Sequence, residues 1–458
     1  MGRHQDNYLA RLCGALLAAA TACAPATSAP PPSTGTTERL NASAGQASAS
    51  ADAGVAERRD CTGPLTFDDA KLEATVRKEL SMPYGDISPY VGELTFLILY
   101  SNSVGTDLGG IECLSSLQEL HVLWTGVTDL GPLAALHGLR HLELRGTPAS
   151  SLVPLAGLQS LRKLVLDGIP VRDLRPLSTL HSLASLNLHL TPVRDLSPLS
   201  SLGGLDQLDL SNTPGTDLRP LAGLRLTRLN LNETKITDLT PLADLSSLQY
   251  LTLEHAPVAD LTPLAALHNL RELDLRSTEV ADLTPLAGLD DLHHLLLADT
   301  KVTDLAPLAG LKRLAWLSLN RTPVDDLTAL AGLTNLHHLD LSFVRARDLA
   351  PLAGLHQLQR LELRGVAVAR LPSLAGLTSL EVLELSSAQL SDLKPLRGLP
   401  RLKRLRVRVV KGVDLKPLLS LERLQHLEIG MPRPDCERPN ATLRQLEARH
   451  AYAHAWCE

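Results

Sequence analysis

Histidine and cysteine are the residues of this sequence best suited to metal binding or catalysis, and the chain has 16 histidines and 6 cysteines. The pairs His293-His294 and His337-His338 are the most suggestive of a metal site. Neighbouring side chains of a strand point to opposite faces, so we expect only His294 and His338 on one face. We expect them two strands apart, about 9.6 Å, which is too far for a shared metal ion. Both pairs are interpreted as solvated polar residues, and we predict no metal or cofactor.

Motifs for other chemistry are also absent from the sequence. It has no Walker loop, dinucleotide-binding glycine motif, His-Glu-x-x-His or Gly-x-Ser-x-Gly. We therefore predict no catalytic residue. The net charge of -6 excludes a global polycation that binds nucleic acid through its phosphates. Since 44% of residues are hydrophobic but 3% are aromatic, the core must consist of leucine, valine and alanine, which favours a regular aliphatic architecture.

A repeat of 22 residues organises the chain from Asp107 onward. One aspartate marks its register, filling thirteen of fifteen successive positions, with Ser151 and Arg370 in the other two. One residue is missing from this spacing at Leu224-Arg225-Leu226. A sustained period of this length is typical of a solenoid of leucine-rich repeats. We expect the missing residue to kink the convex side locally and to leave the sheet unbroken.

Each repeat is expected to form one coil of a strand and a tight turn. In the unit that begins at Asp282, Leu295 and Leu297 alternate with outward residues, whereas the four leucines before them recur every three residues. The first pattern indicates a strand and the second a 3₁₀ turn. Strands stack about 4.8 Å apart and turns need more room. The sequence thus predicts an α/β, right-handed, curved solenoid with a parallel concave sheet, convex 3₁₀ turns and helical caps at both ends.

The repeated aspartate has a predicted structural role. Its carboxylate is placed to accept a hydrogen bond from the amide two residues on, at the start of the turn. A proline three residues after it fills twelve of fifteen positions, where its missing N–H costs nothing. The alternative, calcium bound by stacked aspartates, is disfavoured because one carboxylate per coil supplies too few oxygens.

The repeats resemble the 22-residue leucine-rich repeats of the bacterial internalin type, over about residues 64 to 430. The segments 65–80 and 110–114 are similar to that family's helical cap. The resemblance implies a curved binding scaffold in an exported bacterial protein, with ligand contacts on the concave strands. No host-cell ligand site of the family matches this sequence residue by residue.

The repeats also depart from the family's pattern. Its usual turn asparagine is most often threonine here, so we expect a thinner ladder of hydrogen bonds. Only 28 residues follow the last strand predicted, too few for the immunoglobulin-like, wall-binding or sortase-anchored segments of many internalins. The threonines are Thr125, Thr147, Thr191, Thr213, Thr234, Thr278, Thr300 and Thr322.

The N-terminus has the pattern of an export signal. Arg3 and Arg11 precede a short apolar run from Leu12 to Ala22, too short to span a bilayer. The sequence Ala20-Thr21-Ala22-Cys23 resembles a bacterial lipobox, in which Cys23 would be lipidated. Alanine stands where leucine is usual in a lipobox, so ordinary cleavage between Ala22 and Ala26 stays an alternative, as does an uncleaved leader.

The predicted organisation has five parts. They are a signal peptide at 1–22, a disordered Pro/Ser/Ala-rich tether at 23–60, an N-terminal cap at 61–106, about fifteen repeats at 107–430, and a C-terminal cap at 431–458. The stretch from Ala441 to Trp456 is interpreted as a helix.

Four cysteines flank the solenoid, whose exposed ends need capping. We predict disulfides Cys61–Cys113 and Cys436–Cys457, which require an oxidising compartment. The alternatives, a reactive thiol or a metal pair, lack a Cys-x-x-Cys or a nearby histidine pattern.

The concave strands carry the candidate binding residues. Trp316 should be exposed beside Leu296 and near Phe343, in a column that also holds His294, His338 and Arg360. The alternatives for Trp316 are a binding anchor and a ring packed along the strand. Arg404, Arg406 and Arg408 should project from one strand, either toward an acidic partner or in balance with Glu362, Glu384 and Glu428.

The sequence therefore predicts a monomeric, exported, non-catalytic scaffold of the bacterial envelope that binds a protein partner through its concave face. It contacts no nucleic acid, and a membrane only through a lipid at Cys23. One alternative is a structural envelope spacer without a specific ligand. Another is the substrate-recognition part of a secreted effector.

Overall fold

The computed structural model describes residues 61–366, 371, 374–433, 435, 441–449 and 452–457, and only the backbone of 386–389, 452–453 and 457. All belong to one compact unit, Ala56–Glu458. The predicted signal peptide (1–22), the tether (23–60) with Cys23, and Cys436 lie outside the described residues, as does the side chain of Cys457. None of the described helices is both long and apolar enough to cross a bilayer.

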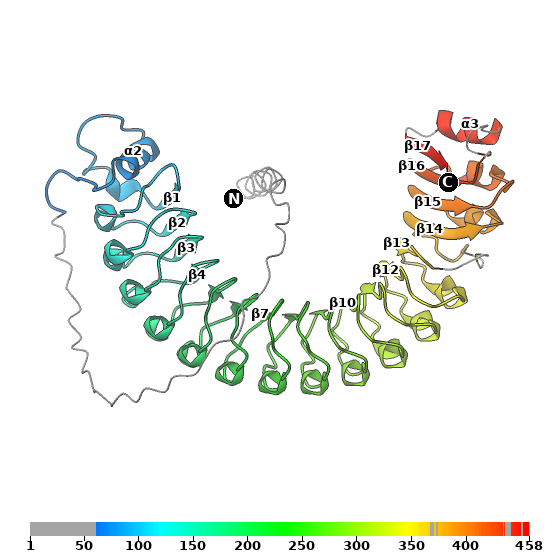
Figure 1. Ribbon diagram of the computed structural model, residues 1–458, viewed down its shortest axis with the longest axis horizontal. Coiled ribbons are helices and arrows are strands. Elements are labelled where there is room, and N and C mark those ends of the chain that lie inside the picture. The colour runs from blue at the N-terminus through cyan, green and yellow to red at the C-terminus, as the bar shows by residue number, and fades with distance from the viewer. Residues whose placement is uncertain are drawn as a thin grey trace, which may run out of the picture. The chain divides into compact units, whose positions relative to one another are not determined.

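Seventeen strands of the described chain form one parallel sheet, in which each strand pairs with the next along the sequence. The strands line the concave side of the solenoid (Figure 1). They are β1 Phe96–Tyr100, β2 Glu119–Leu123, β3 His141–Arg145, β4 Lys163–Val165, β5 Ser185–Asn187, β6 Gln207–Asp209, β7 Arg228–Asn230, β8 Tyr250–Thr252, β9 Glu272–Asp274, β10 His294–Leu296, β11 Trp316–Ser318, β12 His338–Asp340, β13 Arg360–Glu362, β14 Val382–Leu390, β15 Arg404–Val409, β16 His426–Met431 and β17 Tyr452–Cys457.

Short 3₁₀ turns form the convex side opposite the strands (Figure 1). The predicted coil, with a strand on one wall and a 3₁₀ turn on the other, is therefore confirmed. The turns are η1 Val91–Glu93, η2 Ile111–Cys113, η3 Gly131–Ala135, η4 Val153–Leu155, η5 Arg175–Thr179, η6 Ser197–Ser201, η7 Arg219–Leu221, η8 Thr240–Leu242, η9 Thr262–Leu264, η10 Thr284–Leu286, η11 Ala306–Gly310, η12 Thr328–Gly332, η13 Ala350–Gly354, η14 Lys394–Gly398 and η15 Lys416–Ser420.

The core is a stack of leucine layers between the two walls. In the coil that begins at Asp282, the turn leucine Leu286 and the strand leucines Leu295 and Leu297 are all fully buried. A buried leucine side chain stabilises the fold by roughly 2 kcal/mol. The repeated loss of leucine surface to water therefore accounts for the architecture without large aromatic side chains.

The repeated aspartate caps each turn as predicted. In all thirteen coils that have it, a carboxylate oxygen accepts a hydrogen bond of 2.7–3.0 Å from the amide two residues on. At Asp217, hydrogen bonds from the side chain and the amide of Arg219 lower the carboxyl pKa to about 2. Ser151 makes a longer version of the bond, 3.4 Å from the amide of Val153.

The threonines at the usual asparagine position bond within their own coil. In six coils the hydroxyl donates to the carbonyl three residues earlier, at 2.6–2.7 Å. Each of these threonines thus satisfies one buried carbonyl, whereas the Thr147 hydroxyl is buried without a hydrogen-bond partner among the described residues. The shortened coil at Leu224–Leu226 leaves the sheet intact, since β7 still pairs with β6 and β8.

The N-terminal end is closed by helix α2 (Ala70–Glu79), capped by the Asp69 carboxylate. Leu72 and Val76 of this helix are fully buried against the first coils. The predicted disulfide between Cys61 and Cys113 is present, with Cα atoms 5.5 Å apart, and ties the start of this cap to η2.

The C-terminal cap differs from the prediction of one helix over Ala441 to Trp456. Helix α3 ends at Arg449, and Tyr452–Cys457 forms strand β17, which pairs in parallel with β16. The last strand therefore lies beyond the end of the repeats. The physical reason is the free edge of β16, whose unpaired N–H and C=O groups a further strand satisfies. Gly430 leaves room for the Trp456 ring, because a Cβ atom there would lie 2.6 Å from Trp456 Cζ2.

Candidate functional site on the concave sheet

The concave strands present two columns of side chains in the predicted register. In the first column, Trp316 is paired with His294 on one side and His338 on the other, and His338 with Arg360. In the second column, Leu296 of β10 is paired with Ser318 of β11. The parallel pairing therefore brings Trp316, His294, His338 and Arg360 together as the 22-residue period required.

Trp316 lies between two histidine rings, and we call His294, Trp316 and His338 the Trp316 stack. The Trp316 ring stacks on His338 with centroids 4.0 Å apart and an angle of 29° between planes. His294 meets it edge-on at 6.0 Å. Trp316 is nevertheless 41% exposed. The ring therefore packs along the strands and also presents a large face to solvent.

Charged neighbours fix the two histidines. Nε2 of His338 lies 3.5 Å from the Glu362 carboxylate, and Nδ1 of His294 lies 3.5 Å from Glu272. Contact with His338 and a hydrogen bond from Arg360 lower the Glu362 pKa to about 2, although burial opposes the charge. Glu362 is therefore an anion that orients both His338 and Arg360.

Phe343 lies on the turn after β12, at the rim of the sheet. It is 49% exposed and has a positive φ of 61°. Its ring covers Gly365 of the next coil, where a Cβ atom would lie 2.2 Å from the ring. Trp124 repeats this arrangement near the N-terminal end, with φ 51° and its ring over Gly146. Non-glycine residues rarely take this conformation, and for bulky ones it is strained.

The arginine trio of β15 follows the predicted alternation, but its charge balance differs in part. Arg406 Nε lies 3.1 Å from Glu428 Oε2, an ion pair without hydrogen-bond geometry. Glu384, in contrast, is bound by Arg364 at 2.6 Å and approached by Arg360 at 3.6 Å. Arg360 and Arg364 also bind Glu362. Arginines of the β13 coil, two coils before β15, thus bind two of the three glutamates expected to balance the trio, which consists of Arg404, Arg406 and Arg408.

The middle of the concave face is an open polar depression of about 600 Å³ that sequence reasoning did not single out. Several of its polar lining groups contact one another. Asn187 donates to Asp209 at 3.1 Å, and the Arg228 guanidinium lies 3.7 Å from the centre of the Tyr250 ring. This region therefore has a polar character distinct from that of the Trp316 stack.

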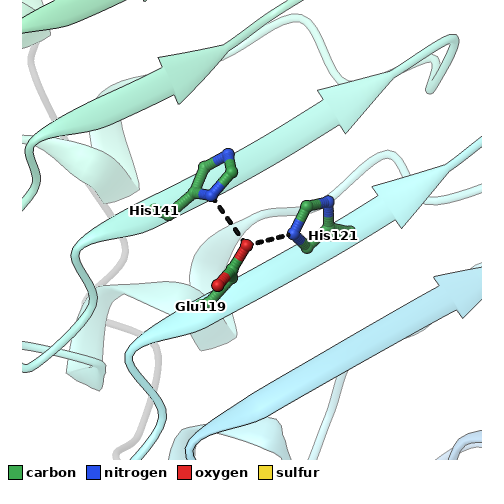
Figure 2. Close-up of side chains that lie close together, drawn as sticks. All are labelled: Glu119, His121 and His141. Atoms are coloured by element: carbon green, nitrogen blue, oxygen red, sulfur yellow. Dashed lines mark hydrogen bonds and ion pairs between the residues drawn. The ribbon is translucent and has the colours of Figure 1, made fainter. Parts of the chain in front are cut away.

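A second group of residues, missed by sequence reasoning, lies on β2 and β3. Glu119 and His121 of β2 face His141 and Glu143 of β3, and we call these four residues the Glu–His cluster. Glu119 Oε1 lies 2.8 Å from His121 Nε2 and 2.8 Å from His141 Nδ1 (Figure 2). The other nitrogen of His121, Nδ1, lies 2.8 Å from Glu143 Oε2. One ligand atom each from Glu119, His121 and His141 lies within 4.8 Å of the others.

The two histidines of the cluster have opposite protonation preferences. His121 is 2% exposed, and burial opposes its charge, but hydrogen bonds to Glu143 and Glu119 outweigh burial and raise its pKa. At His141, burial together with the charges of Lys163 and His121 lowers the pKa. The pKa values of Glu119 and Glu143 are lowered despite burial, chiefly by hydrogen bonds from His121.

The signal for this cluster is visible in the sequence. Glu119-x-His121 places both side chains on one face of a strand, and His141-x-Glu143 follows 22 residues later in the same register with the two types exchanged. Adjacent strands then bring each glutamate beside a histidine. A search for neighbouring histidines overlooks this pattern, because neighbours in a strand point to opposite faces.

Comparison with known proteins gives matches among solved structures only; no protein-family model and no curated protein matches the sequence. An internalin (InlF) from Listeria monocytogenes is 28% identical, with a TM-score of 0.60 over 77% of this chain and 98% of that one. A leucine-rich-repeat protein from Leptospira interrogans is 21% identical, with a TM-score of 0.64 over 74% of this chain and 96% of that one.

A more distant similarity is to a plant peptide hormone receptor, RGFR1, solved in complex with RGF2. It is 17% identical, with a TM-score of 0.53 over 73% of this chain and 61% of the receptor. The strand register, the convex 3₁₀ turns and these similarities agree with one another. The protein therefore has the internalin-type leucine-rich-repeat fold that its sequence pattern predicts.

Proposed function

We propose that the protein is an exported, non-catalytic scaffold of the bacterial envelope that binds a protein partner through its concave face. The observation that carries this proposal is Trp316, 41% exposed on strand β11 of the parallel sheet and stacked on His338. Tryptophan is enriched among the residues that dominate protein interfaces. A ring already fixed between two side chains loses little rotamer freedom on binding, so more of its contact energy contributes to affinity.

The fold supports a binding role more generally. A concave sheet of outward side chains is an extended surface on which repeat proteins bind their ligands. One protein with a similar fold is the plant peptide hormone receptor RGFR1, whose structure was solved in complex with RGF2. This complex agrees with recognition of a peptide or protein. The partner's chemistry would be apolar where it covers Trp316 and anionic where it approaches Arg404, which is exposed.

Export is supported by two independent features. The apolar run before Cys23 has the pattern of a signal peptide with a lipobox. The Cys61–Cys113 disulfide suits an oxidising compartment outside the cytoplasm. We propose that Cys23 carries a lipid and that residues 24–60 separate the solenoid from the membrane. Replacing Cys23 by alanine should release the protein from the membrane fraction and abolish incorporation of a labelled fatty acid, whereas retention of both would contradict a lipid anchor.

The main experiment compares capture of partners by three forms of the full-length protein. Wild type and Val153→Ala should enrich the same partner from envelope fractions of the source bacterium, and Trp316→Ala should lose it. Val153 is a matched control because it is an exposed apolar side chain, 66% accessible, on a convex turn. A variant with alanine at Arg404, Arg406 and Arg408 tests whether the arginine-rich part of the concave face, on β15, also binds the partner.

A structural spacer is the second candidate, favoured by the ion pairs that satisfy Glu362 and Glu384 within the sheet. A surface whose charges are already paired has less to offer a partner. If all variants enrich the same proteins as wild type, or none enriches any, the concave binding role is wrong and the spacer role is favoured.

A further inference from the structure

The Glu–His cluster has the composition of a transition-metal site. Two imidazoles and one carboxylate, from His121, His141 and Glu119, are a ligand set that suits Zn²⁺. Calcium and magnesium prefer sites made of oxygen ligands alone. The same set recurs in zinc sites that keep one coordination position open for water.

The geometry needs little adjustment to accept an ion. Ligands of a tetrahedral zinc site with bonds of about 2.1 Å lie about 3.4 Å apart. Glu119 Oε1 is now 2.8 Å from each of the two histidine nitrogens, and all three atoms lie within 4.8 Å of one another. All three side chains project from paired strands, so rotations about their side-chain bonds can open the group while the backbone stays fixed.

The surroundings supply the supporting contacts that such sites have. Glu143 Oε2 accepts a hydrogen bond from Nδ1 of His121, which would leave Nε2 for the metal. Arg145 in turn holds Glu143 at 2.9 Å. Phe96 meets the His121 ring edge-on at 5.6 Å and packs against one side of that ring.

The protein's own groups leave His141 incomplete. Its Nε2 is buried and has no hydrogen-bond partner among the described residues, but this nitrogen points away from Glu119 (Figure 2), and the nitrogen that would bind the ion is Nδ1. Its Nδ1 shares Glu119 Oε1 with His121, so a single carboxylate oxygen serves two imidazoles. Buried polar atoms are normally satisfied, and an ion between the three groups would remove the competition for that oxygen.

We propose that Glu119, His121 and His141 bind one Zn²⁺-class ion on the concave face, with Glu143 as a supporting residue that orients His121. Glu119 is the most accessible of the three, with 38% of its side chain exposed, and the open position of the ion lies on that side. This site is separate from the Trp316 stack and does not depend on the proposed protein partner.

The test uses the full-length protein without a polyhistidine tag, stripped of metal with a chelator and titrated with Co²⁺ and then Zn²⁺. We expect one equivalent of Co²⁺ to give visible absorption bands of a tetrahedral site, which one equivalent of Zn²⁺ then removes. His141→Ala and Glu119→Gln should abolish the bands. Glu143→Gln should weaken affinity about 10- to 100-fold, as loss of a supporting contact does.

The matched control is the double variant His294→Ala/His338→Ala, which removes two concave histidines from the Trp316 stack and should bind as wild type does. Circular dichroism of each variant verifies that the solenoid is folded. The proposal is overturned if wild type shows no saturable band, which would leave the cluster as an ion-pair network alone. It is also overturned if folded His141→Ala and Glu119→Gln keep the band, because the ion would then bind elsewhere.

Discussion

The Glu–His cluster and the Trp316 stack lie on the same sheet and have opposite characters. In the cluster, charged groups on two adjacent strands face one another, and His121 is almost completely buried between two carboxylates. In the stack, the two histidines stand two strands apart with Trp316 between them, and the indole remains 41% exposed. The cluster is therefore a polar group around a buried histidine, whereas the stack presents a large exposed aromatic face.

The difference shows what spacing controls in a solenoid with a fixed period. Residues 22 apart lie side by side, so exchanging Glu and His between neighbouring coils creates contacts of 2.8 Å. Residues 44 apart are separated by one strand, and the side chain on that strand decides what they contact. We expect mutations in the cluster to act mainly on stability and ion binding, and mutations in the stack to act mainly on partner binding.

The largest effect on stability is expected from His121→Leu. This change removes both hydrogen bonds of a buried imidazole, and it leaves Glu119 with His141 and Glu143 with Arg145 as their remaining partners. Loss of two hydrogen bonds between a buried imidazole and charged carboxylates should lower the free energy of unfolding by about 2–3 kcal/mol. Urea unfolding followed by circular dichroism measures this loss. His294→Leu is the matched control in the stack and should change stability by less than about 0.5 kcal/mol. Equal losses at both positions would contradict the contrast between the regions.

The second effect is on protonation. An unperturbed histidine has a pKa of about 6.5. We expect the pKa of His121 to lie above that value and the pKa of His141 to lie below it. NMR titration of the imidazole carbons without added metal measures both pKa values. Glu143→Gln removes one of the carboxylates that raise the pKa of His121, so this pKa should fall as burial gains weight. A His121 pKa at or below 6.5 in wild type would contradict the balance of burial and ion pairing.

These shifts fix the sign of the pH dependence of stability. The raised pKa of His121 contributes stability that is present below about pH 6.5 and is lost as pH rises through the folded pKa. The lowered pKa values of Glu119 and Glu143 contribute stability present above about pH 4.3 and lost as pH falls through their folded pKa values. The lowered pKa of His141 acts against His121 and reduces stability as pH falls below about 6.5. His141→Ala should therefore make the cluster more stabilising at pH 5.5 relative to pH 7.5 than it is in wild type.

The third expected effect is on the free energy of unfolding, and it comes from the rim of the sheet. There, each of the two regions has an aromatic ring over a glycine. Gly146→Ala places a Cβ atom 2.6 Å from Trp124 Cδ1, in a residue with φ of 59°. Gly168→Ala is the matched control, since it has φ of 67° and nothing within 4 Å. The control should cost about 1 kcal/mol for left-handed backbone alone, and Gly146→Ala about 1 kcal/mol more. The difference should vanish in the Trp124→Ala background, which a double-mutant cycle measures. An excess cost that persists without Trp124 would contradict the ring contact.

Much of this arrangement follows from the sequence, because a period of 22 fixes which residues are neighbours. The coil, the aspartate caps and the pairing of Trp316 with His294 and His338 all result from that register. The Glu–His cluster was within reach of the same rule, since Glu119 and His141 are 22 residues apart. It was missed because attention to adjacent histidines selects pairs that point to opposite faces.

Other features do not follow from periodicity. Strand β17 lies outside the repeats, and its pairing depends on the free edge of β16, which local sequence does not reveal. The left-handed conformation of Trp124 and Phe343 is imposed by the position in the coil and not by the residue, since glycine, asparagine and aspartate take the same position in other coils. Aromatic residues there are consequently unexpected from propensity alone.

The Trp316→Ala change should affect stability less than His121→Leu does. The ring covers His338 but buries little else, since 41% of the residue is exposed and the leucines behind it are fully buried. Stacked pairs are worth roughly 0.5–1.5 kcal/mol beyond their buried area, so the free energy of unfolding should fall by about 1 kcal/mol. Urea unfolding of Trp316→Ala beside His121→Leu checks the order of the two. A loss at Trp316 as large as that at His121 would assign the indole a structural role and remove the main reason to treat it as a binding anchor. A small loss together with full loss of partner capture would establish the opposite, because the residue would then be dispensable for the fold and required for the contact.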